Sequence, residues 1–130
     1  MTVSFEYTIQ GRIPSKKNSR ITNRKTGRSF PSKAYTAWEK EAILQIAAND
    51  VKLQHPIEKC TRVSLIIYFP CKRKADLTNK AESVMDMLIK AGVLIDDAWQ
   101  ITGPVKLYPQ YRKGEGGAEI YIEVEFNGPC

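Results

Sequence analysis

The sequence predicts an α+β fold in which a single domain over residues 1–130 holds one mixed sheet with two helices packed on one face. Three observations predict it. Apolar residues recur with the period of a strand in some segments and with the period of a helix in others. These segments follow one another as strand, basic loop, helix, strand, helix, strand and strand. A length of 130 residues also suits one domain that buries its own core.

The N-terminal part of the chain supplies a strand, a loop and a helix. Residues 3–10 alternate apolar and polar side chains, which is typical of a strand with one buried face. Residues 11–33 carry many cations but no acid, and Gly, Pro, Ser and Asn interrupt them. We therefore expect a long loop or a loose hairpin around residues 24–28. A helix is predicted over residues 33–49, with Ser32 as its N-cap.

The middle of the chain supplies a central strand and a second helix. Residues 62–69 are almost continuously apolar, as in a strand inside a sheet. Residues 79–91 show the helical period, with Thr78 or Asn79 as N-cap and Gly92 at the C′ position. The buried stripe of this helix is predicted to be Ala81, Val84, Met85, Leu88 and Ala91.

The last part of the chain supplies two strands. Residues 101–112 contain Pro104 and Pro109, which suggests an edge strand or a strand with bulges. A turn over residues 113–117 leads to a final strand over residues 118–126, in which apolar and polar side chains alternate.

The charge of the chain points to an anionic partner. The formal net charge of +6 suggests a nucleic acid, an acidic protein or a membrane surface. The cations gather in residues 11–33 and 72–74. Phe30 and Tyr35 are candidates for stacking on bases, whereas Trp99 is expected in the core. Phosphate contacts are predicted for Lys16, Lys17, Arg20, Arg28, Lys72, Arg73 and Lys74.

The rest of the composition excludes several kinds of protein and site. The three cysteines are far apart, which argues against a disulfide framework or a zinc ribbon and fits a reducing cytoplasm. We expect no signal peptide, because the N-terminal residues alternate between apolar and polar. We expect no membrane association, because no apolar run approaches the roughly 18 residues of a span. His55 is the only histidine, which excludes a multi-histidine metal site, and the chain has no P-loop.

The carboxylates form the pattern that suggests a chemistry. Asp76 precedes the second helix, and residues 96–97 are two adjacent aspartates just beyond its last turn. Glu82 and Asp86 lie four residues apart on one face of that helix. If the strand end and the later turn fold back together, Asp76 and Asp97 converge. Such a cluster suits Mg²⁺ or Mn²⁺, which activate water and stabilise charge on a phosphodiester.

Each acid also has an interpretation that needs no metal. Asp76 is then a solvated loop residue, and residues 96–97 form a turn. Glu82 is then the glutamate of a capping box, and Asp86 pairs with Lys90 on the helix surface. The basic loop is then a solvated arm.

Residues 69–101 resemble the RusA family of Holliday junction resolvases. The segments 14–20 and 31–38 look like the N-terminal half of that family. The matching features are Asp76-Leu77 with Asn79, Asp86 on the helix, Lys90-Ala91-Gly92 and the pair Asp96-Asp97.

The resemblance implies a small Mg²⁺-dependent endonuclease without a small-molecule cofactor. It would act as a homodimer and make paired symmetric nicks in four-way DNA junctions during recombination and repair. Phages and prophages often encode such proteins. The resemblance also implies that Asp76 and Asp97 are metal-binding catalytic acids, with Asp96 as their neighbour.

The chain departs from the family pattern at two positions. The pattern D-L-D-N has a third catalytic aspartate where this chain has Thr78, and a functional lysine where this chain has Glu82. We hypothesise that Glu82 replaces the missing acid, and we predict that Asp97 faces the metal. The predicted catalytic set is Asp76, Asp96, Asp97 and Glu82, and Asp86 joins these four as a metal ligand.

Three alternatives stay open at this stage. The protein is a weak or inactive junction-binding protein if Thr78 abolishes the metal site. It is a nuclease for other branched DNA, such as flaps or forks, if only the substrate differs. It is a basic adaptor for an acidic partner if the acids have structural roles alone.

Overall fold

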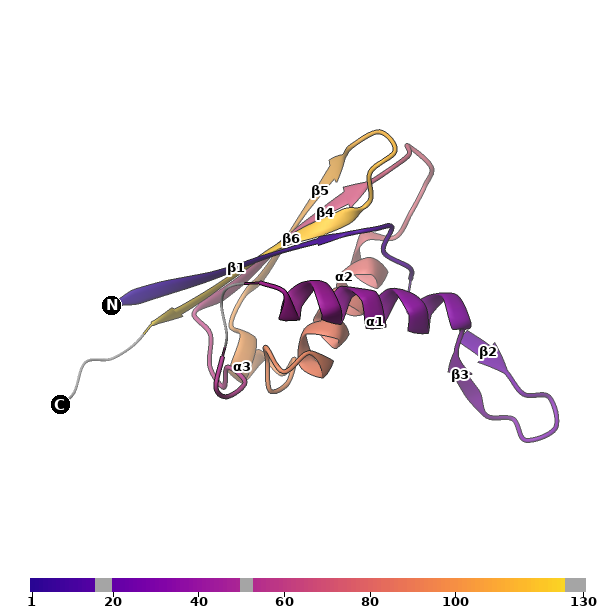
Figure 1. Cartoon of the computed structure of the whole chain (residues 1–130), viewed down its shortest axis with the longest axis horizontal. Coiled ribbons are helices and arrows are strands. Elements are labelled where there is room, and N and C mark those ends of the chain that lie inside the picture. Colours follow the sequence, from indigo (N-terminus) through magenta and orange to yellow (C-terminus); the bar gives the residue numbers. More distant parts are fainter. Residues whose placement is uncertain (16–19, 50–52, 126–130) are drawn as a thin grey trace.

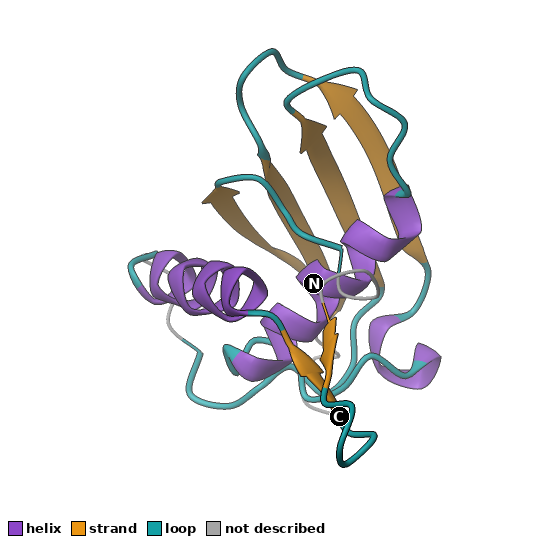
Figure 2. Ribbon diagram, turned by 90° about the vertical axis from the view of Figure 1, so that its right-hand side faces the viewer, coloured by secondary structure: helices purple, strands orange, loops and turns teal. Residues whose placement is uncertain are grey.

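One mixed four-stranded sheet with helices on a single face makes up the computed structural model of the chain (Figures 1 and 2). The structure describes residues 1–15, 20–49 and 53–125. Helices α1 (Lys33–Ala47) and α2 (Leu77–Lys90) cover the same face, as the sequence predicted. In spatial order, the strands of the sheet are β1 (Thr2–Gln10), β6 (Gly117–Glu125), β4 (Arg62–Phe69) and β5 (Val105–Tyr111).

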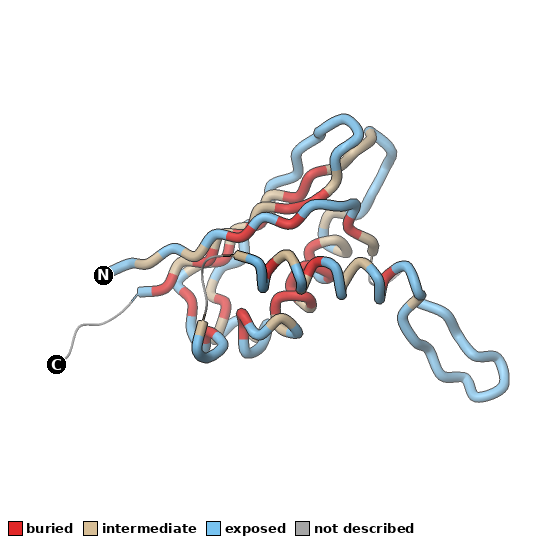
Figure 3. Tube along the Cα trace, viewed as in Figure 1, coloured by how far each residue is buried: buried red, intermediate tan, exposed pale blue. Residues whose placement is uncertain are grey.

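The strand order explains the apolar pattern of each strand. β4 lies inside the sheet, antiparallel to β6 and parallel to β5, which confirms its predicted central place. Its alternate residues Val63, Leu65 and Ile67 are fully buried, as are Ile120 and Ile122 of β6. Burying one such side chain contributes about 1.5–3 kcal/mol, so this layer between sheet and helices, red in Figure 3, dominates the stability.

The first helix begins where the sequence predicted. The Ser32 hydroxyl accepts a hydrogen bond of 3.1 Å from the backbone N–H of Tyr35, which confirms the N-cap. Tyr35 itself is buried, together with Ala42 and Ile46, on the side of α1 that faces the rest of the molecule. The prediction that Tyr35 stacks on bases is therefore wrong, because its ring is part of the interior.

The second helix begins earlier than predicted. Asp76, rather than Thr78 or Asn79, is its N-cap, and the Asp76 carboxylate accepts the backbone N–H groups of both residues. The first turn of a helix has free N–H groups that an aspartate satisfies well, so the helix starts at Leu77. Gly92 follows the last turn with a φ of 79°, which confirms its predicted C′ position.

The segment after the second helix differs most from the prediction. A short helix, α3 (Trp99–Thr102), takes the place of the first residues of the predicted strand, and β5 begins only at Val105. β5 is an edge strand, as its prolines predicted. Trp99 is 76% exposed, so its expected place in the core is wrong. The residue of α3 that is buried is Thr102, not Trp99.

The basic loop contains the predicted hairpin. Strands β2 (Arg20–Thr22) and β3 (Ser29–Pro31) pair antiparallel, and Gly27 in their connection has a φ of 71°. We call residues 20–31 the arm. The arm extends away from the sheet beyond the start of α1, and all of its residues are exposed (Figures 1 and 3). Two of the predicted phosphate contacts, Lys16 and Lys17, lie outside the described residues.

The structure also bears on the cysteines and on membrane spans. Cys60 and Cys71 are both free cysteines, and burial raises the pKa of the Cys60 thiol to about 11. Cys60 is therefore a neutral core residue at physiological pH. Across the ranges that the structure describes, no helix combines the length and the apolar character needed to cross a membrane.

Candidate functional site

The predicted acids lie at opposite ends of α2. Asp76 caps the N-terminus of this helix, and residues 96–97 follow its C-terminal end. A helix of 14 residues is about 21 Å long at 1.5 Å per residue. Beyond Gly92 the chain stays at the C-terminal end of the helix, because the backbone N–H groups of Val93 and Leu94 both donate to the Leu88 carbonyl, at 3.0 and 3.3 Å.

The convergence of Asp76 and Asp97 within one chain, expected from the sequence, is therefore wrong. Within residues 1–15, 20–49 and 53–125, no three His, Cys, Asp or Glu side chains lie close enough to hold a metal ion. The catalytic and metal-binding roles of the individual acids stay predictions.

Hydrogen bonds fix the Asp76 carboxylate at the start of the helix. Its Oδ1 accepts from the Thr78 hydroxyl at 2.7 Å and from the backbone N–H groups of Thr78 at 3.0 Å and Asn79 at 3.3 Å. Its Oδ2 accepts from the Asn79 amide at 3.1 Å. The side chain at position 78 thus donates a hydrogen bond to Asp76, where an aspartate would add a second negative charge.

The other two acids of α2 face different surroundings. Glu82 is exposed, and it is not a capping-box residue, because the third residue of the helix is Asn79. Six residues of helix place it about 240° around the axis from Asp76 and about 9 Å further along. An Asp86 oxygen lies 3.5 Å from the Lys90 ammonium, which confirms the predicted surface pair, and Lys90 also bonds Glu39 at 3.0 Å.

One hydrogen bond links the adjacent aspartates 96 and 97, which lie in irregular structure rather than in the predicted turn. The backbone N–H of Asp97 donates to Asp96 Oδ1 at 2.8 Å. Both residues are exposed, so water screens their mutual repulsion and their adjacency costs little. The two carboxylates stand between the buried Leu94 and the exposed Trp99.

A basic cleft adjoins Asp76. It has a volume of about 420 Å³ and lies between residues 12–15, residues 74–76, Lys80, and Ala34 and Trp38 of α1. We call it the Asp76 cleft. Its charged residues are Arg12, Lys74, Lys80 and Asp76. Among the described cations that were predicted to contact phosphate, Lys74 lines this cleft.

Arg12 and Lys80 are cations of this cleft that the sequence analysis missed. The Lys80 ammonium donates a hydrogen bond to the carbonyl oxygen of Ile13. Burial lowers the pKa of Lys80, and the nearby Arg12 cation lowers it further. The sequence did contain a signal for Lys80: it lies four residues after Asp76, and residues four apart share a helix face. No local signal placed Arg12 there.

The other predicted phosphate contacts within the described residues occupy other surfaces. The Arg20 guanidinium donates to the side chain and the backbone carbonyl of Ser29, both at 2.8 Å, and so links the two strands of the arm. Arg28 and Arg73 are exposed. The Lys72 ammonium lies 5.1 Å from the centre of the Tyr111 ring.

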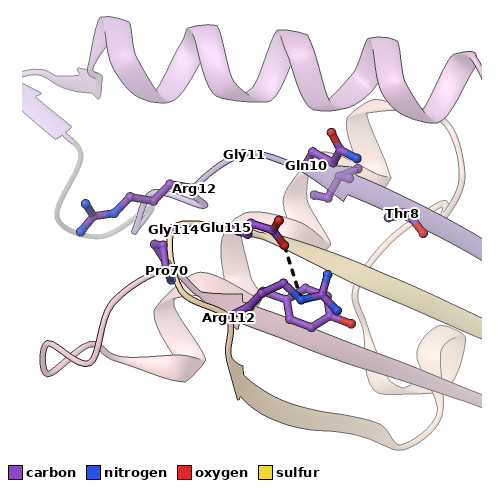
Figure 4. A pocket seen from close by; sticks show the side chains of 11 residues that line it. Thr8, Gln10, Gly11, Arg12, Pro70, Arg112, Gly114 and Glu115 are labelled. Atoms are coloured by element: carbon purple, nitrogen blue, oxygen red, sulfur yellow. Dashed lines mark ion pairs between the residues drawn. The ribbon is translucent and has the colours of Figure 1, made fainter.

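A second cavity, of about 540 Å³, lies near the ends of β1, β4 and β6 (Figure 4). Arg112 lies 3.8 Å over the Tyr68 ring and 3.7 Å from a Glu115 oxygen. In Figure 4 the Arg12 side chain points away from Arg112 and Glu115. Because Arg112 and Glu115 pair with each other, this cavity has less charge to offer a phosphate than the Asp76 cleft.

The chain is a two-layer α+β protein, and its exposed basic arm and the basic cleft beside a carboxylate are features typical of proteins that bind polyanions. The family model described as Endodeoxyribonuclease RusA matches residues 10–125, and the chain belongs to this family. It is 28% identical over 111 residues to the crossover junction endodeoxyribonuclease RusA of Aquifex aeolicus (strain VF5), which covers 85% of each protein. The resemblance stated from the motifs is confirmed.

Proposed function

We propose that the protein is a metal-dependent endonuclease that cuts four-way DNA junctions by paired symmetric nicks, in recombination and repair. The observation that carries this proposal is the family match over residues 10–125, which includes the arm, the Asp76 cleft and all of the predicted acids. The name of the Aquifex aeolicus relative, a crossover junction endodeoxyribonuclease, supports the choice of substrate. We also infer a cytoplasmic location, because the proposed substrate is DNA.

The proposed metal site takes its ligands from two copies of the chain. Carboxylates are the ligands that Mg²⁺ and Mn²⁺ prefer, so Asp76, Asp96 and Asp97 suit these ions by type. Because α2 separates Asp76 from the other two, we assign Asp76 of one copy and Asp96 and Asp97 of the second copy to one ion. A homodimer then holds two equivalent sites, as two symmetric cuts require.

The chain's own residues prepare this site for its substrate. Thr78 and Asn79 hold the Asp76 carboxylate in one orientation, and the cations of the cleft and the arm bind the DNA backbone. A bound divalent ion supplies activated water and stabilises negative charge on the phosphodiester. Glu82 is left out of the proposed set, because it is turned away from Asp76 along α2.

The first test compares a labelled four-way junction with a linear duplex of the same sequence. We expect symmetric nicks in the junction with Mg²⁺, none with EDTA, and none in the linear duplex. Asp76→Asn is expected to lower the nicking rate at least a hundredfold while junction binding is kept, because the amide retains the helix cap but not the charge. Nicking by Asp76→Asn at the wild-type rate would contradict the proposal.

A second candidate function has one observation in its favour. The Thr78 hydroxyl occupies Asp76 Oδ1 at 2.7 Å, where the family pattern supplies another carboxylate. A junction-binding protein without nuclease activity fits this loss of charge. Tight and selective binding of the junction, without nicks in either Mg²⁺ or Mn²⁺, would identify this function.

A further inference from the structure

We propose that the Asp76 cleft is a binding site for one backbone phosphodiester of the DNA, held by Lys80 and Arg12. This inference rests on the proposed function, since it names the residues that hold the substrate beside a candidate metal ligand. Neither residue belongs to the phosphate contacts expected from the sequence.

The shape and charge of the cleft fit a phosphodiester. Its volume of about 420 Å³ admits a phosphate group with the sugars on either side. Arg12, Lys74 and Lys80 line it, and Asp76 is the acid among the described residues of its wall. Three cations from two separate segments therefore face one carboxylate, and the excess positive charge attracts an anion.

A hydrogen bond holds the Lys80 side chain in this cleft. Its chain rises from the second turn of α2, and its ammonium donates one hydrogen bond to the Ile13 carbonyl. Two of its three N–H groups are then left for other acceptors. On the next turn of the helix, the Ser83 hydroxyl donates to the Pro14 carbonyl at 2.6 Å, so residues 13–14 are fastened to α2 at two points.

The fold brings Lys80 close to a second cation. Arg12 directly precedes the fastened residues 13–14, and its charge lowers the pKa of Lys80 in addition to the effect of burial. Two like charges that a rigid fold holds near each other repel, and an anion between them removes the repulsion. A phosphate also accepts hydrogen bonds from both side chains, which strengthens the contact.

The position of this site gives it a role beyond general attraction. Arg20 is engaged within the arm and Lys72 lies against Tyr111, whereas Lys80 and Arg12 share a cleft with Asp76. A phosphodiester held by Lys80 and Arg12 lies beside the carboxylate that we assign to the metal. The cleft thus selects which phosphate of the backbone is presented for cutting.

The test measures junction binding in EDTA over a range of salt concentrations, for Lys80→Met and Arg12→Gln. Each variant is expected to bind about tenfold more weakly at low salt, because one charge-assisted hydrogen bond is lost. The slope of log Kobs against log salt is expected to shrink by about 0.9 for each phosphate contact removed. Lys106→Met, an exposed cation of the edge strand β5, is the matched control and should keep the wild-type slope.

A purely structural role for Lys80 would lower stability without a change of slope. Thermal unfolding of each variant is therefore recorded, and Arg12→Gln keeps the test decisive if Lys80→Met does not fold, because Arg12 is exposed. A wild-type slope in folded Arg12→Gln would overturn the proposal. If the slopes shrink but wild-type protein makes no nicks with Mg²⁺, the phosphate site stands and the nuclease function fails.

Discussion

At the scale of single residues, position 78 decides how much negative charge the candidate site carries. The Thr78 hydroxyl donates to Asp76 Oδ1 at 2.7 Å, so the two side chains are direct neighbours at the start of α2. A carboxylate at this position would lie within reach of any cation that Asp76 binds. The hydroxyl instead uses one of the acceptor positions of Asp76.

We predict that Thr78→Asp tightens the binding of divalent ions. The substitution adds a second carboxylate beside Asp76, and two neighbouring carboxylates repel until a cation joins them. The Mg²⁺ concentration for half-maximal junction nicking is expected to fall several-fold. Thr78→Ser keeps the hydroxyl and serves as the control with unchanged Mg²⁺ dependence. An equal Mg²⁺ requirement in Thr78→Asp and wild type would show that position 78 lies outside the metal site.

At the scale of elements, helix α2 separates the predicted acids, and helix α3 carries an exposed tryptophan. Helix α2 is about 21 Å long, since its 14 residues are regular from cap to cap, and it lies between Asp76 and the segment that leads to residues 96–97. Backbone hydrogen bonds to Ile57 from both sides of Leu94 anchor the segment beyond the helix. Short α3 then presents Trp99 to solvent beside the two aspartates.

This arrangement predicts that replacing Trp99 lowers the free energy of unfolding very little, whereas replacing Leu94, five positions earlier, lowers it strongly. Trp99→Ala is expected to change the free energy of unfolding by less than about 0.5 kcal/mol, because the side chain is 76% exposed. Leu94→Ala is expected to cost about 2–5 kcal/mol, because Leu94 is fully buried and its removal leaves a cavity. Urea unfolding of both variants measures these differences. A loss above 2 kcal/mol in Trp99→Ala would mean that Trp99 is covered in solution.

At the scale of the whole molecule, two copies are needed for the proposed chemistry. A single chain keeps its acids at the two ends of one helix, whereas a twofold dimer can bring the N-terminal end of one α2 to the C-terminal end of the other. The net charge of +6 per chain gives such a dimer a strong attraction for four-way DNA.

Mixing two inactive variants tests the shared site. Asp76→Asn and Asp97→Asn are each expected to be inactive alone. In their heterodimer, a shared site pairs the two substituted residues with each other and the two native acids with each other, so one intact site returns. Co-refolded mixtures should therefore nick one strand of the junction.

The control for this experiment mixes Asp76→Asn with the double variant that carries both substitutions. No site in that heterodimer has both acids, so no nicks are expected. If native mass spectrometry finds the heterodimer of the two single variants but it does not nick DNA, the assignment of acids to different copies is refuted.

The elements that follow from local chemistry were predictable from the sequence. The alternation of β1, the Ser32 cap, the C′ glycine at Gly92 and the prolines of an edge strand all depend on residues close together in the chain. The motif around Asp76 and the aspartate pair likewise identified the family, since a motif is a local property of a sequence.

Only the tertiary structure decided where those residues meet. The chain after Gly92 stays at the C-terminal end of α2, opposite Asp76, and long-range packing brings Arg12 to Lys80 and leaves Trp99 in solvent. Hydrophobic periodicity specifies which face of an element is buried, but it does not specify which elements become neighbours. The sequence by itself thus determined the types of chemical group in this protein, whereas the packing of distant segments determined which groups act together.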